Sequence, residues 1–323
     1  MLTSYPTLPA GATPFQGRRV CVTGGAGFIG SHLVEALVGA GADVAVIDDL
    51  SNGFESNLAT VRDRIRFGRG SILDDAALAT ALEGAEVVYH EAALGSVPAS
   101  LERPLVYQQV NTEGTVRVLE ACRRAGVRRV VYAASSSAYG DQPVSPKVES
   151  MVPDPLSPYA VSKLAGEHFL RAYANCYGLS SVALRYFNIF GPRQRADSPY
   201  AAVIPKFADA LRAGRKPVIF GDGRQTRDFT FIANVVWANM LAGAVDRPLA
   251  GQCVNIACGG SASLLELLEQ MARILGAPAE AEHAPARAGD VTHSRASIDA
   301  AAALIGYSPI VGFAEGLRLT LAP

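Results

Sequence analysis

The sequence of 323 residues lacks any apolar run approaching the roughly 20 residues that a membrane-spanning helix needs. Its formal net charge is only −1, which gives no reason to expect a nucleic acid or an anionic membrane as a partner. The first sixteen residues contain no Lys or Arg and no apolar segment. We therefore expect no secretory signal there, but a loose arm rich in Pro, Thr and Gly.

Cysteine is also scarce, and the few cysteines are scattered. Their number is odd, no zinc-binding spacing occurs among them, and the five histidines do not cluster near them. We expect reduced thiols, no metal site and a cytoplasmic location. The five cysteines are Cys21, Cys122, Cys176, Cys253 and Cys258.

What the chain does have is a regular alternation of short apolar runs and longer helical stretches. This pattern predicts the α/β class, with a Rossmann-like, doubly wound parallel sheet buried on both faces. The predicted strands are Arg19–Thr23, Asp43–Ile47, Ile65–Phe67, Val87–His90, Val130–Ala134 and Ser181–Arg185. The predicted helices between them are Ile29–Val38, Ala76–Leu82, Val110–Arg124 and Pro158–Tyr177.

The alternation ends after Tyr186, where Gly and Pro punctuate shorter elements. This change predicts three parts: a flexible arm at 1–17, the doubly wound domain at 18–180, and a smaller α/β substrate lobe at 181–323. Segments near 225–257 are expected to return to the first domain. Two further helices are expected at Leu264–Leu275 and Ala296–Leu304.

Three glycines follow the first predicted strand and open the first helix. Gly24, Gly27 and Gly30 lie where backbone amides and a helix N-terminus can approach a pyrophosphate. Tight turns also use glycine, but the strand before and the helix after favour a dinucleotide site.

The second predicted strand ends in Asp48, eighteen residues beyond Gly30. A carboxylate there accepts hydrogen bonds from ribose hydroxyls and repels a 2′-phosphate, which predicts NAD rather than NADP. The alternative is a solvated acidic turn. Ala92 and Ala93, after the fourth strand, are small enough for a cofactor to lie close, although a buried strand end has the same pattern.

The candidate catalytic residues are Tyr159 and Lys163, four positions apart on one helix face, with the serines from Ser135 to Ser137 upstream. Pro158 in the first turn and Ser157 as N-cap would start that helix just before Tyr159. An ammonium beside a phenol lowers its pKa, so Tyr159 is expected to serve as a general base for an alcohol. An ordinary polar loop and a partly exposed helix face are the alternatives.

With these motifs in view, the chain resembles an extended short-chain dehydrogenase/reductase, specifically a nucleotide-sugar 4-epimerase. The stretches that carry this resemblance are VTGGAGFIGSHL, VIDDLSNG, AASSSAYGD, SPYAVSKLAGE, LRYFNIFGPRQ, FGDGRQTRDF and RAGD. The resemblance implies a tightly held NAD, Tyr159 as base, Lys163 on the nicotinamide ribose and Ser135 as a proton-bridging hydroxyl.

The resemblance also assigns residues that the pattern alone leaves open. One departure is Ser71, where relatives often carry Asp near the adenine, although Ile72 is retained. Further cofactor contacts are implied for Phe28, Ile29, Asn52, Ile72 and Asn111. Contacts with the sugar nucleotide are implied for Ser96, Ser136, Ser137, Asn188, Val203, Pro205, Phe220, Arg227, Arg287, Asp290 and Ser294.

The expected reaction is C4 epimerisation of a UDP-hexose through a transient 4-keto sugar, in a homodimer. Ser294 lies where a bulky tyrosine narrows the pocket of strict glucose/galactose enzymes, so UDP-GlcNAc/UDP-GalNAc is preferred here, with UDP-Glc/UDP-Gal also open. Ala99 departs from the arginine of the acetyl-preferring group. A 4,6-dehydratase is disfavoured because Ser136 and Ser137 replace the Asp and Glu of those relatives. A UDP-glucuronate 4-epimerase or decarboxylase, and a non-catalytic NAD-binding regulator, remain as alternatives.

Overall fold

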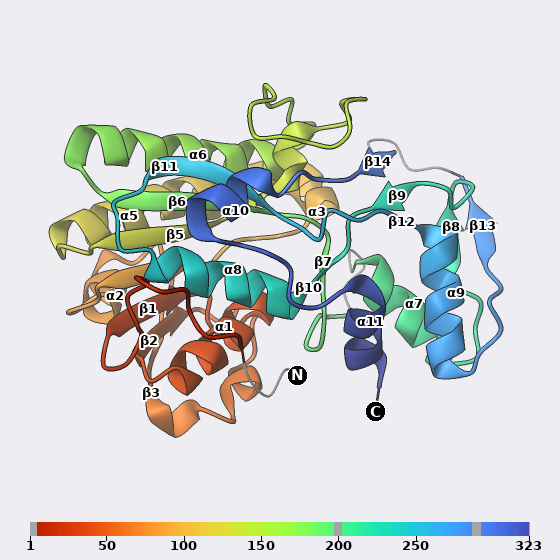
Figure 1. Cartoon of the computed structure of the whole chain (residues 1–323), viewed down its shortest axis with the longest axis horizontal. Helices are drawn as coiled ribbons and strands as arrows, with labels where there is room; N and C mark the ends of the chain where they lie inside the picture. Colours follow the sequence, from red (N-terminus) through yellow and green to blue (C-terminus); the bar gives the residue numbers. More distant parts are fainter. Residues whose placement is uncertain (1–4, 197–201, 286–291, 323) are drawn as a thin grey trace.

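The computed structural model describes residues 5–196, 202–285 and 292–322, and its centre is a parallel sheet (Figure 1). Within the described residues this sheet has seven strands, and every neighbouring pair is parallel. In spatial order they are β11 (Ala250–Ile256), β6 (Ser180–Tyr186), β5 (Arg129–Ser135), β4 (Val87–His90), β1 (Arg19–Thr23), β2 (Asp43–Asp48) and β3 (Ile65–Arg69).

Helices cover both faces of the sheet, as right-handed crossovers between parallel strands require. One layer contains α1 (Phe28–Gly39) and α8 (Ile232–Ala244), which pack on each other. The other contains α2 (Asp75–Ala81), α5 (Gly114–Arg124) and α6 (Pro158–Tyr177). The chain order reverses between β1 and β4, and ligands of doubly wound folds bind at that switch point, beyond the carboxyl ends of the strands.

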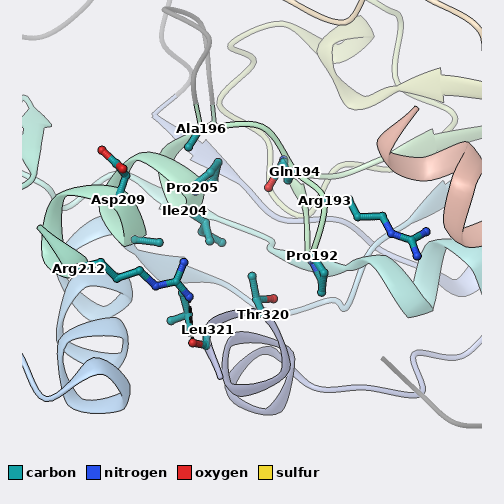
Figure 2. A pocket seen from close by; sticks show the side chains of 12 residues that line it. Pro192, Arg193, Gln194, Ala196, Ile204, Pro205, Asp209, Arg212, Thr320 and Leu321 are labelled. Atoms are coloured by element: carbon teal, nitrogen blue, oxygen red, sulfur yellow. Dashed lines mark hydrogen bonds between the residues drawn. The ribbon is translucent and has the colours of Figure 1, made fainter. Parts of the chain in front are cut away.

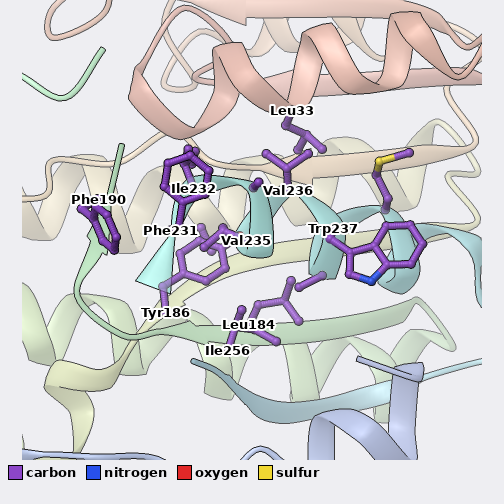
Figure 3. Close-up of a cluster of buried hydrophobic side chains, with 14 of the residues drawn as sticks. Leu33, Leu184, Tyr186, Phe190, Phe231, Ile232, Val235, Val236, Trp237 and Ile256 are labelled. Carbon is purple, nitrogen blue, oxygen red and sulfur yellow. The ribbon is translucent and has the colours of Figure 1, made fainter. Parts of the chain in front are cut away.

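The core around α8 explains why this helix is apolar except for Asn234 and Asn239. All of its residues are buried, and Val235, Val236 and Trp237 lie between Leu33 of α1 and Leu184 of β6 (Figure 3). A helix buried all round loses the amphipathic pattern of a surface helix. It therefore returns to the first domain, as expected, together with β11, which adds a seventh strand beside β6.

The elements of the first domain follow the sequence pattern closely, with one exception at the N-terminus. The expected loose arm is packed against the molecule from Tyr5 onward: Phe15 is 1% exposed, and the Thr13 N–H donates to the Ala244 carbonyl at 2.8 Å. Burial of two aromatic rings outweighs the Pro and Gly content that suggested a free segment.

Short elements connect the crossovers, and one of them is a π-helix. They are η1 (Glu55–Leu58), η2 (Arg62–Arg64), α3 (Val97–Glu102), α4 (Pro104–Tyr107), the π-helix η3 (Gln108–Glu113) and η4 (Ser136–Tyr139). The helix expected at 110–124 is thus π-helical in its first turn, which periodicity cannot reveal.

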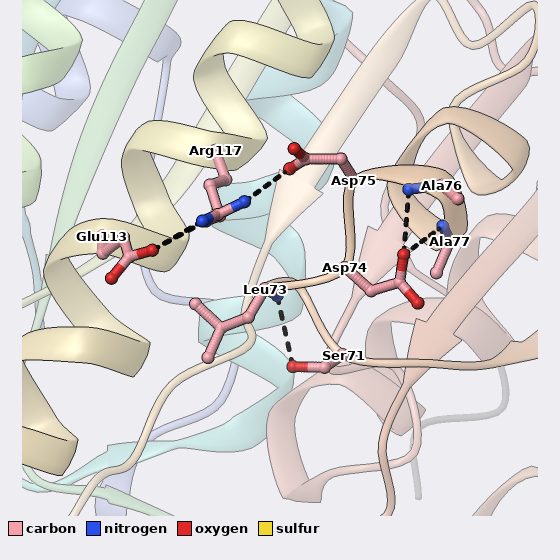
Figure 4. A network of polar contacts seen from close by, with 8 residues as sticks. All are labelled: Ser71, Leu73, Asp74, Asp75, Ala76, Ala77, Glu113 and Arg117. Atoms are coloured by element: carbon pink, nitrogen blue, oxygen red, sulfur yellow. Dashed lines mark hydrogen bonds and ion pairs between the residues drawn. The ribbon is translucent and has the colours of Figure 1, made fainter.

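Helices α2 and α5 are joined by polar contacts (Figure 4). Arg117 of α5 pairs with Asp75 at 2.9 Å and with Glu113 at 2.8 Å, while Asp74 caps α2. The Ser71 hydroxyl accepts the Leu73 N–H at 3.2 Å and so stabilises its own turn. The departure at Ser71 is accommodated within this turn.

The rest of the chain forms the smaller lobe and its connections. Its helices are α7 (Val203–Arg212), α9 (Leu264–Leu275) and α11 (Phe313–Leu321), while α10 (Asp299–Ile305) packs on β11 and α8 of the first domain. Its short strands are β7 (Ile189–Phe190), β8 (Val218–Phe220), β9 (Thr226–Arg227), β10 (Thr230–Phe231), β12 (Ala262–Ser263), β13 (Glu282–Ala284) and β14 (His293–Ser294). Helix α9 begins and ends where the sequence predicts, whereas α10 begins three residues later than expected, after an irregular segment.

Candidate active site

The glycine turn joins β1 to α1 and leaves no room for side chains. Gly24 has φ +69°, and its N–H donates to the Ile47 carbonyl at 2.8 Å. A Cβ on Gly30 would lie 2.2 Å from the Gly24 carbonyl oxygen, and a Cβ on Gly24 would lie 2.7 Å from the Ala92 backbone. Gly27 is the N-cap of α1. The turn therefore keeps its backbone open at the switch point, followed by the half-buried Phe28 and Ile29.

Asp48, at the end of β2, holds this turn in place. Its Oδ2 accepts the Ala26 N–H at 2.9 Å, and its Oδ1 accepts the Leu50 N–H at 2.8 Å. Burial raises the pKa of the carboxyl, and these two hydrogen bonds lower it. A carboxylate accepts about four hydrogen bonds, so it retains capacity for ribose hydroxyls. Asn52, further along, is exposed.

A chain of hydrogen bonds runs behind the end of β4. The Ala92 N–H donates to Thr23 Oγ1 at 3.3 Å, Thr23 lies 2.8 Å from His90 Nδ1, and His90 Nε2 lies 3.0 Å from Thr115 Oγ1. The Thr115 hydroxyl donates to the Asn111 carbonyl at 2.5 Å. Burial lowers the pKa of His90 to about 3, so the ring is neutral. The row of hydrogen bonds fixes the backbone at Ala92, which leads to Ala93.

Asn111 lies in the π-helix and joins two parts of the site. Its amide exchanges two hydrogen bonds with the Leu94 backbone, at 2.8 and 3.0 Å, and donates to Ser162 Oγ at 3.0 Å. Ser162 in turn donates to the Tyr159 carbonyl at 2.8 Å. Asn111 is 1% exposed, so it fixes the loop after β4 to the first turn of α6. Gly114 begins α5 directly after this π-helix, and the buried Ile72 side chain lies close to it.

The start of α6 is as predicted: Ser157 caps the helix by accepting the Ala160 N–H at 3.2 Å, and Pro158 occupies the first turn. This cap places Tyr159 near Ser135, whose side chain lowers the pKa of the phenol. The Ser137 hydroxyl donates to Ser135 Oγ at 2.9 Å. Ser135 therefore has one hydroxyl neighbour in Ser137 and lies near the Tyr159 phenol.

The charges around Tyr159 differ from the sequence expectation. Burial raises the pKa of this phenol, and the nearby Ser135 side chain opposes that change without reversing it. The Lys163 ammonium instead lies 4.5 Å from the centre of the Tyr132 ring. Burial lowers the pKa of Lys163 to about 8. The expectation that Lys163 lowers the pKa of Tyr159 is therefore wrong for this structure, because desolvation dominates.

Three residues predicted to contact substrate meet although they are far apart in the chain. Asn188, with φ +34°, donates to Ser294 Oγ at 3.3 Å, and Ser294 pairs with Arg227 in the β9–β14 register. The neighbouring Asp228 is buried and accepts the N–H groups of Cys258 and Ala296 at 3.0 and 3.2 Å. This carboxylate anchors the small sheet to the end of β11.

Other predicted substrate contacts are more dispersed. Pro205 lines a hollow of about 220 Å³ with Arg193, Arg212 and Leu321, next to α7 and α11 (Figure 2). The residues lining it do not include Tyr159 or Phe220. Val203 begins α7, Phe220 ends β8, Ser96 caps α3, and Ser136 opens η4. Arg287 and Asp290 lie outside the described residues.

Sequence reasoning did not find several residues of this corner. Tyr107 packs edge-on against Tyr159, with ring centres 6.4 Å apart, and its hydroxyl accepts the Ser96 N–H at 3.2 Å. The Tyr186 hydroxyl donates to Glu91 Oε1 at 2.8 Å and accepts from Asn239 at 2.7 Å. An acidic residue directly after a buried strand was the signal available for Glu91.

These residues fit a dinucleotide. The glycine turn is a cradle that a single Cβ would fill, and a buried carboxylate ends the neighbouring strand. The described residues contain no group of three or more His, Cys, Asp or Glu placed to hold a metal ion. Across the same described ranges, no helix combines the length and apolarity needed to cross a membrane.

Comparison with known proteins agrees with this geometry. A model of the NAD dependent epimerase/dehydratase family matches residues 20–257, and the chain belongs to that family. This membership confirms the predicted fold class and NAD as the cofactor.

Individual relatives cover nearly the whole chain. A UDP-glucose 4-epimerase of Mycolicibacterium smegmatis is 42% identical, covering 94% of this chain and 97% of its own. A solved UDP-N-acetylglucosamine 4-epimerase of Methanobrevibacter ruminantium, in complex with UDP-N-acetylmuramic acid, has TM-score 0.90 and 39% identity, covering 95% and 97%. A UDP-glucuronate 4-epimerase of Thermodesulfobacterium geofontis is 33% identical, covering 93% and 94%.

Proposed function

We propose that this protein is an NAD-dependent UDP-hexose 4-epimerase. The observation that carries the proposal is the placement of Tyr159, at the start of α6, near enough to Ser135 for that side chain to lower its pKa, at the carboxyl end of β5 and on a sheet whose switch point holds the glycine turn. A hydroxyl pair there can take a proton from an alcohol whose carbon faces a nicotinamide. The three relatives described above all carry the name of a UDP-sugar 4-epimerase.

The chain's own residues would handle binding and the proton. Gly24, Gly27, Gly30, Asp48 and Lys163 would hold NAD, which would supply a reversible hydride acceptor. Tyr159 would take the C4 hydroxyl proton directly or through Ser135, and give it back after the 4-keto sugar has turned over. Because burial raises the Tyr159 pKa, a nearby positive charge such as that of oxidised NAD would favour the phenolate.

The remaining predicted cofactor contacts complete the proposed NAD site. Phe28 and Ile29 follow the glycine turn, Asn111 fixes the loop after β4, and the exposed Asn52 accepts a hydrogen bond from Arg195 at 3.3 Å. We place Ile72, Ala92 and Ala93 beside the adenosine half, on the strength of the family resemblance.

We propose that the UDP group is held firmly and the hexose loosely, so that the sugar can rotate while it is tethered. The diphosphate is assigned to Arg227 and Arg287, whose guanidinium groups suit phosphate oxygens. The uridine is assigned to Val203, Pro205 and Phe220. Asn188 is assigned to the sugar diphosphate, and the sugar side to Ser96, Ser136, Ser137, Asp290 and Ser294.

The proposed preference is for UDP-GlcNAc and UDP-GalNAc, with UDP-Glc and UDP-Gal as further substrates. The hydrogen bond from Asn188 shows that the Ser294 side chain points toward a residue assigned to the substrate. A side chain as small as serine leaves room there that a tyrosine would fill, which supports this preference. UDP-glucuronate is the second candidate, since one relative is a UDP-glucuronate 4-epimerase. A non-catalytic regulator would not require the Ser135, Tyr159 and Lys163 set that is present here.

Incubation of the purified protein with UDP-GlcNAc, UDP-Glc and UDP-glucuronate, followed by product identification, tests this function. We expect C4 inversion of the first two substrates with no loss of carbon dioxide or water. Decarboxylation of UDP-glucuronate would replace the proposal with its alternative, and three unchanged sugars would contradict it.

We also propose a homodimer formed through α5 and α6. Val161, Phe169 and Tyr177 are exposed apolar side chains on α6, and a hollow of about 440 Å³ lies between α2, α5 and α6.

A cytoplasmic location is supported by five cysteines that are all free. For the domains, we propose a division near residue 180, between the NAD-binding domain and the lobe that binds the sugar nucleotide.

A further inference from the structure

Arg185, near the carboxyl end of β6, is a buried cation that the proposed proton transfer does not use. Its side chain is 4% exposed, and its Nε and Nη2 atoms donate to the two carboxylate oxygens of Glu167 at 2.9 and 2.7 Å. One guanidinium group thus engages both oxygens. This bidentate geometry fixes the orientation of the two side chains as well as their distance.

The same guanidinium group lies over an aromatic ring. Its carbon is 4.5 Å from the centre of the Tyr139 ring, and its third nitrogen, Nη1, is buried without a hydrogen-bond acceptor among the residues that the structure describes. A ring face attracts a cation and compensates part of that loss. The Tyr139 hydroxyl donates to Asn255 Oδ1 at 2.7 Å, and Asn255 lies beside Arg185 in the register of β11 with β6. The ring is therefore held in place from its hydroxyl end.

Glu167 and Tyr139 belong to the two elements that carry the proposed catalytic residues. Glu167 lies on α6, eight residues after Tyr159 and four after Lys163, so the three side chains share one side of the helix. Tyr139 ends η4, the short turn whose N-cap is Ser135. Helix α6 and η4 lie against each other, and the guanidinium group contacts a side chain of each.

We propose that Arg185 is a positioning residue, which holds α6 and η4 at a fixed separation and so keeps the Tyr159 phenol beside Ser135. This inference deepens the proposed function and rests on it for the effect on turnover, but not for the geometry. Because two charges must be desolvated, a buried ion pair is in general weak evidence for stability. The role of Arg185 lies in the forked, flat shape of its guanidinium group as well as in its charge.

The first test is Arg185→Lys, which keeps the charge but offers neither the fork nor the flat face. We expect kcat with UDP-GlcNAc to fall roughly 10- to 100-fold, because a displacement of about 1 Å in an active site can cost up to that factor. The KM for UDP-GlcNAc and the NAD released on denaturation should stay at wild-type values, because the residues assigned to UDP and the glycine turn are unchanged. A crystal structure of the variant should show η4 displaced relative to α6.

The matched control is Arg129→Lys. Arg129 is similarly buried but lies at the amino end of β5, where it donates to the Ser180 hydroxyl and the Ala242 carbonyl, each at 3.2 Å. The proposed site lies beyond the opposite end of the sheet. This variant should therefore lose thermal stability and keep the wild-type kcat.

A second variant keeps the inference testable if Arg185→Lys does not fold. The double substitution Arg185→Met with Glu167→Leu replaces the ion pair by apolar side chains of similar volume. Such replacements of buried pairs are often neutral or stabilising. We expect a folded protein with the same fall in kcat at unchanged KM, whereas a purely structural role of the pair predicts normal turnover.

A wild-type kcat in either folded variant would overturn the inference, and so would a crystal structure of Arg185→Lys with η4 and α6 in their wild-type positions. An equal loss of kcat in Arg129→Lys would overturn it too, because the effect would then be general destabilisation. Displacement of η4 in Arg185→Lys, together with a wild type that inverts no sugar, would keep the positioning and contradict the proposed function instead. The two failures are therefore distinguishable.

Discussion

The two sides of the proposed cofactor site are built in opposite ways. The glycine turn is made of backbone: it works because Gly24 and Gly30 have no Cβ, and a single methyl group would collide with main-chain atoms. The corner around Tyr159 is made of side chains, since Ser135, Asn111 and Lys163 are placed by hydrogen bonds and buried charge. The glycine turn depends on the absence of side chains, whereas the corner around Tyr159 depends on the functional groups of its side chains.

This difference predicts separate consequences for the two sides. Changes to the proton-transferring hydroxyls of the corner, Tyr159 and Ser135, should stop turnover and leave NAD bound, whereas changes in the turn should release NAD. A hydroxyl variant of the corner that released NAD, or a glycine variant of the turn that kept NAD but lost turnover, would contradict this comparison.

The largest effect is expected for Tyr159→Phe. Loss of the phenolic hydroxyl removes the proposed base, and general acid–base catalysis contributes about 10²–10⁴-fold, so kcat should fall by that factor. Bound NAD, measured after denaturation, should be unchanged. Tyr177→Phe, which removes a hydroxyl from the exposed end of the same helix, is the control and should keep normal turnover. Near-normal activity of Tyr159→Phe would disprove the assignment.

Gly30→Ala should abolish tight NAD binding, because its Cβ would lie 2.2 Å from the Gly24 carbonyl oxygen and no side chain can move aside. The matched control is Gly39→Ala at the end of the same helix, where a Cβ meets nothing within 4 Å. That substitution should be neutral or stabilise the protein by up to about 1 kcal/mol. Dinucleotide content and thermal unfolding measure both effects; retention of NAD by Gly30→Ala would contradict the steric account.

Asn111→Ala should weaken the connection between the loop after β4 and α6. The substitution leaves the Leu94 N–H and carbonyl groups without their partner, which costs about 1–3 kcal/mol of unfolding free energy. We expect a lower kcat as well, because Ser162 and Tyr159 lose a fixed neighbour. Gln109→Ala, exposed in the same π-helical turn, should change neither the denaturant midpoint nor kcat.

The smallest effect is expected for Asp48→Asn. An amide can replace only one of the two oxygens that accept backbone N–H groups, and hydrogen bonds to charged groups contribute about 1.5–3 kcal/mol. NAD affinity should fall about tenfold or more, and discrimination against NADP should narrow because the negative charge is lost. Asp49→Asn, whose exposed carboxylate caps only the Ser51 N–H, should bind both cofactors as the wild type does. Unchanged affinities in Asp48→Asn would show that the turn does not depend on this carboxylate.

The elements of the first domain could be predicted because local sequence determines them. Strands β1 and β4 have the predicted ends, being short apolar runs bounded by charge and glycine, and Ser157 with Pro158 defines the start of α6. The π-helical turn at Asn111 could not be predicted. The Asn111 side chain is hydrogen-bonded to Leu94 and Ser162, and such contacts between residues distant in sequence leave no local pattern.

In the candidate site, too, the residues set by local sequence could be predicted and those set by distant contacts could not. The glycine turn, Asp48, Tyr159 and Lys163 were visible as motifs, whereas Asn188, Arg227 and Ser294 were assigned only through the family resemblance. The Glu91–Tyr186–Asn239 network connects the residue after β4 with residues of β6 and α8, so no window of sequence contains it. The direction of the Tyr159 pKa change was missed because burial is a property of the fold.

The most direct test of the central claim uses UDP-GlcNAc carrying deuterium at C4. The account predicts UDP-GalNAc as the product, inverted at C4 with the deuterium retained there, because the same hydride is removed and returned. Inversion with loss of deuterium to water, or recovery of unchanged UDP-GlcNAc together with unchanged UDP-glucose in a parallel incubation, would contradict it.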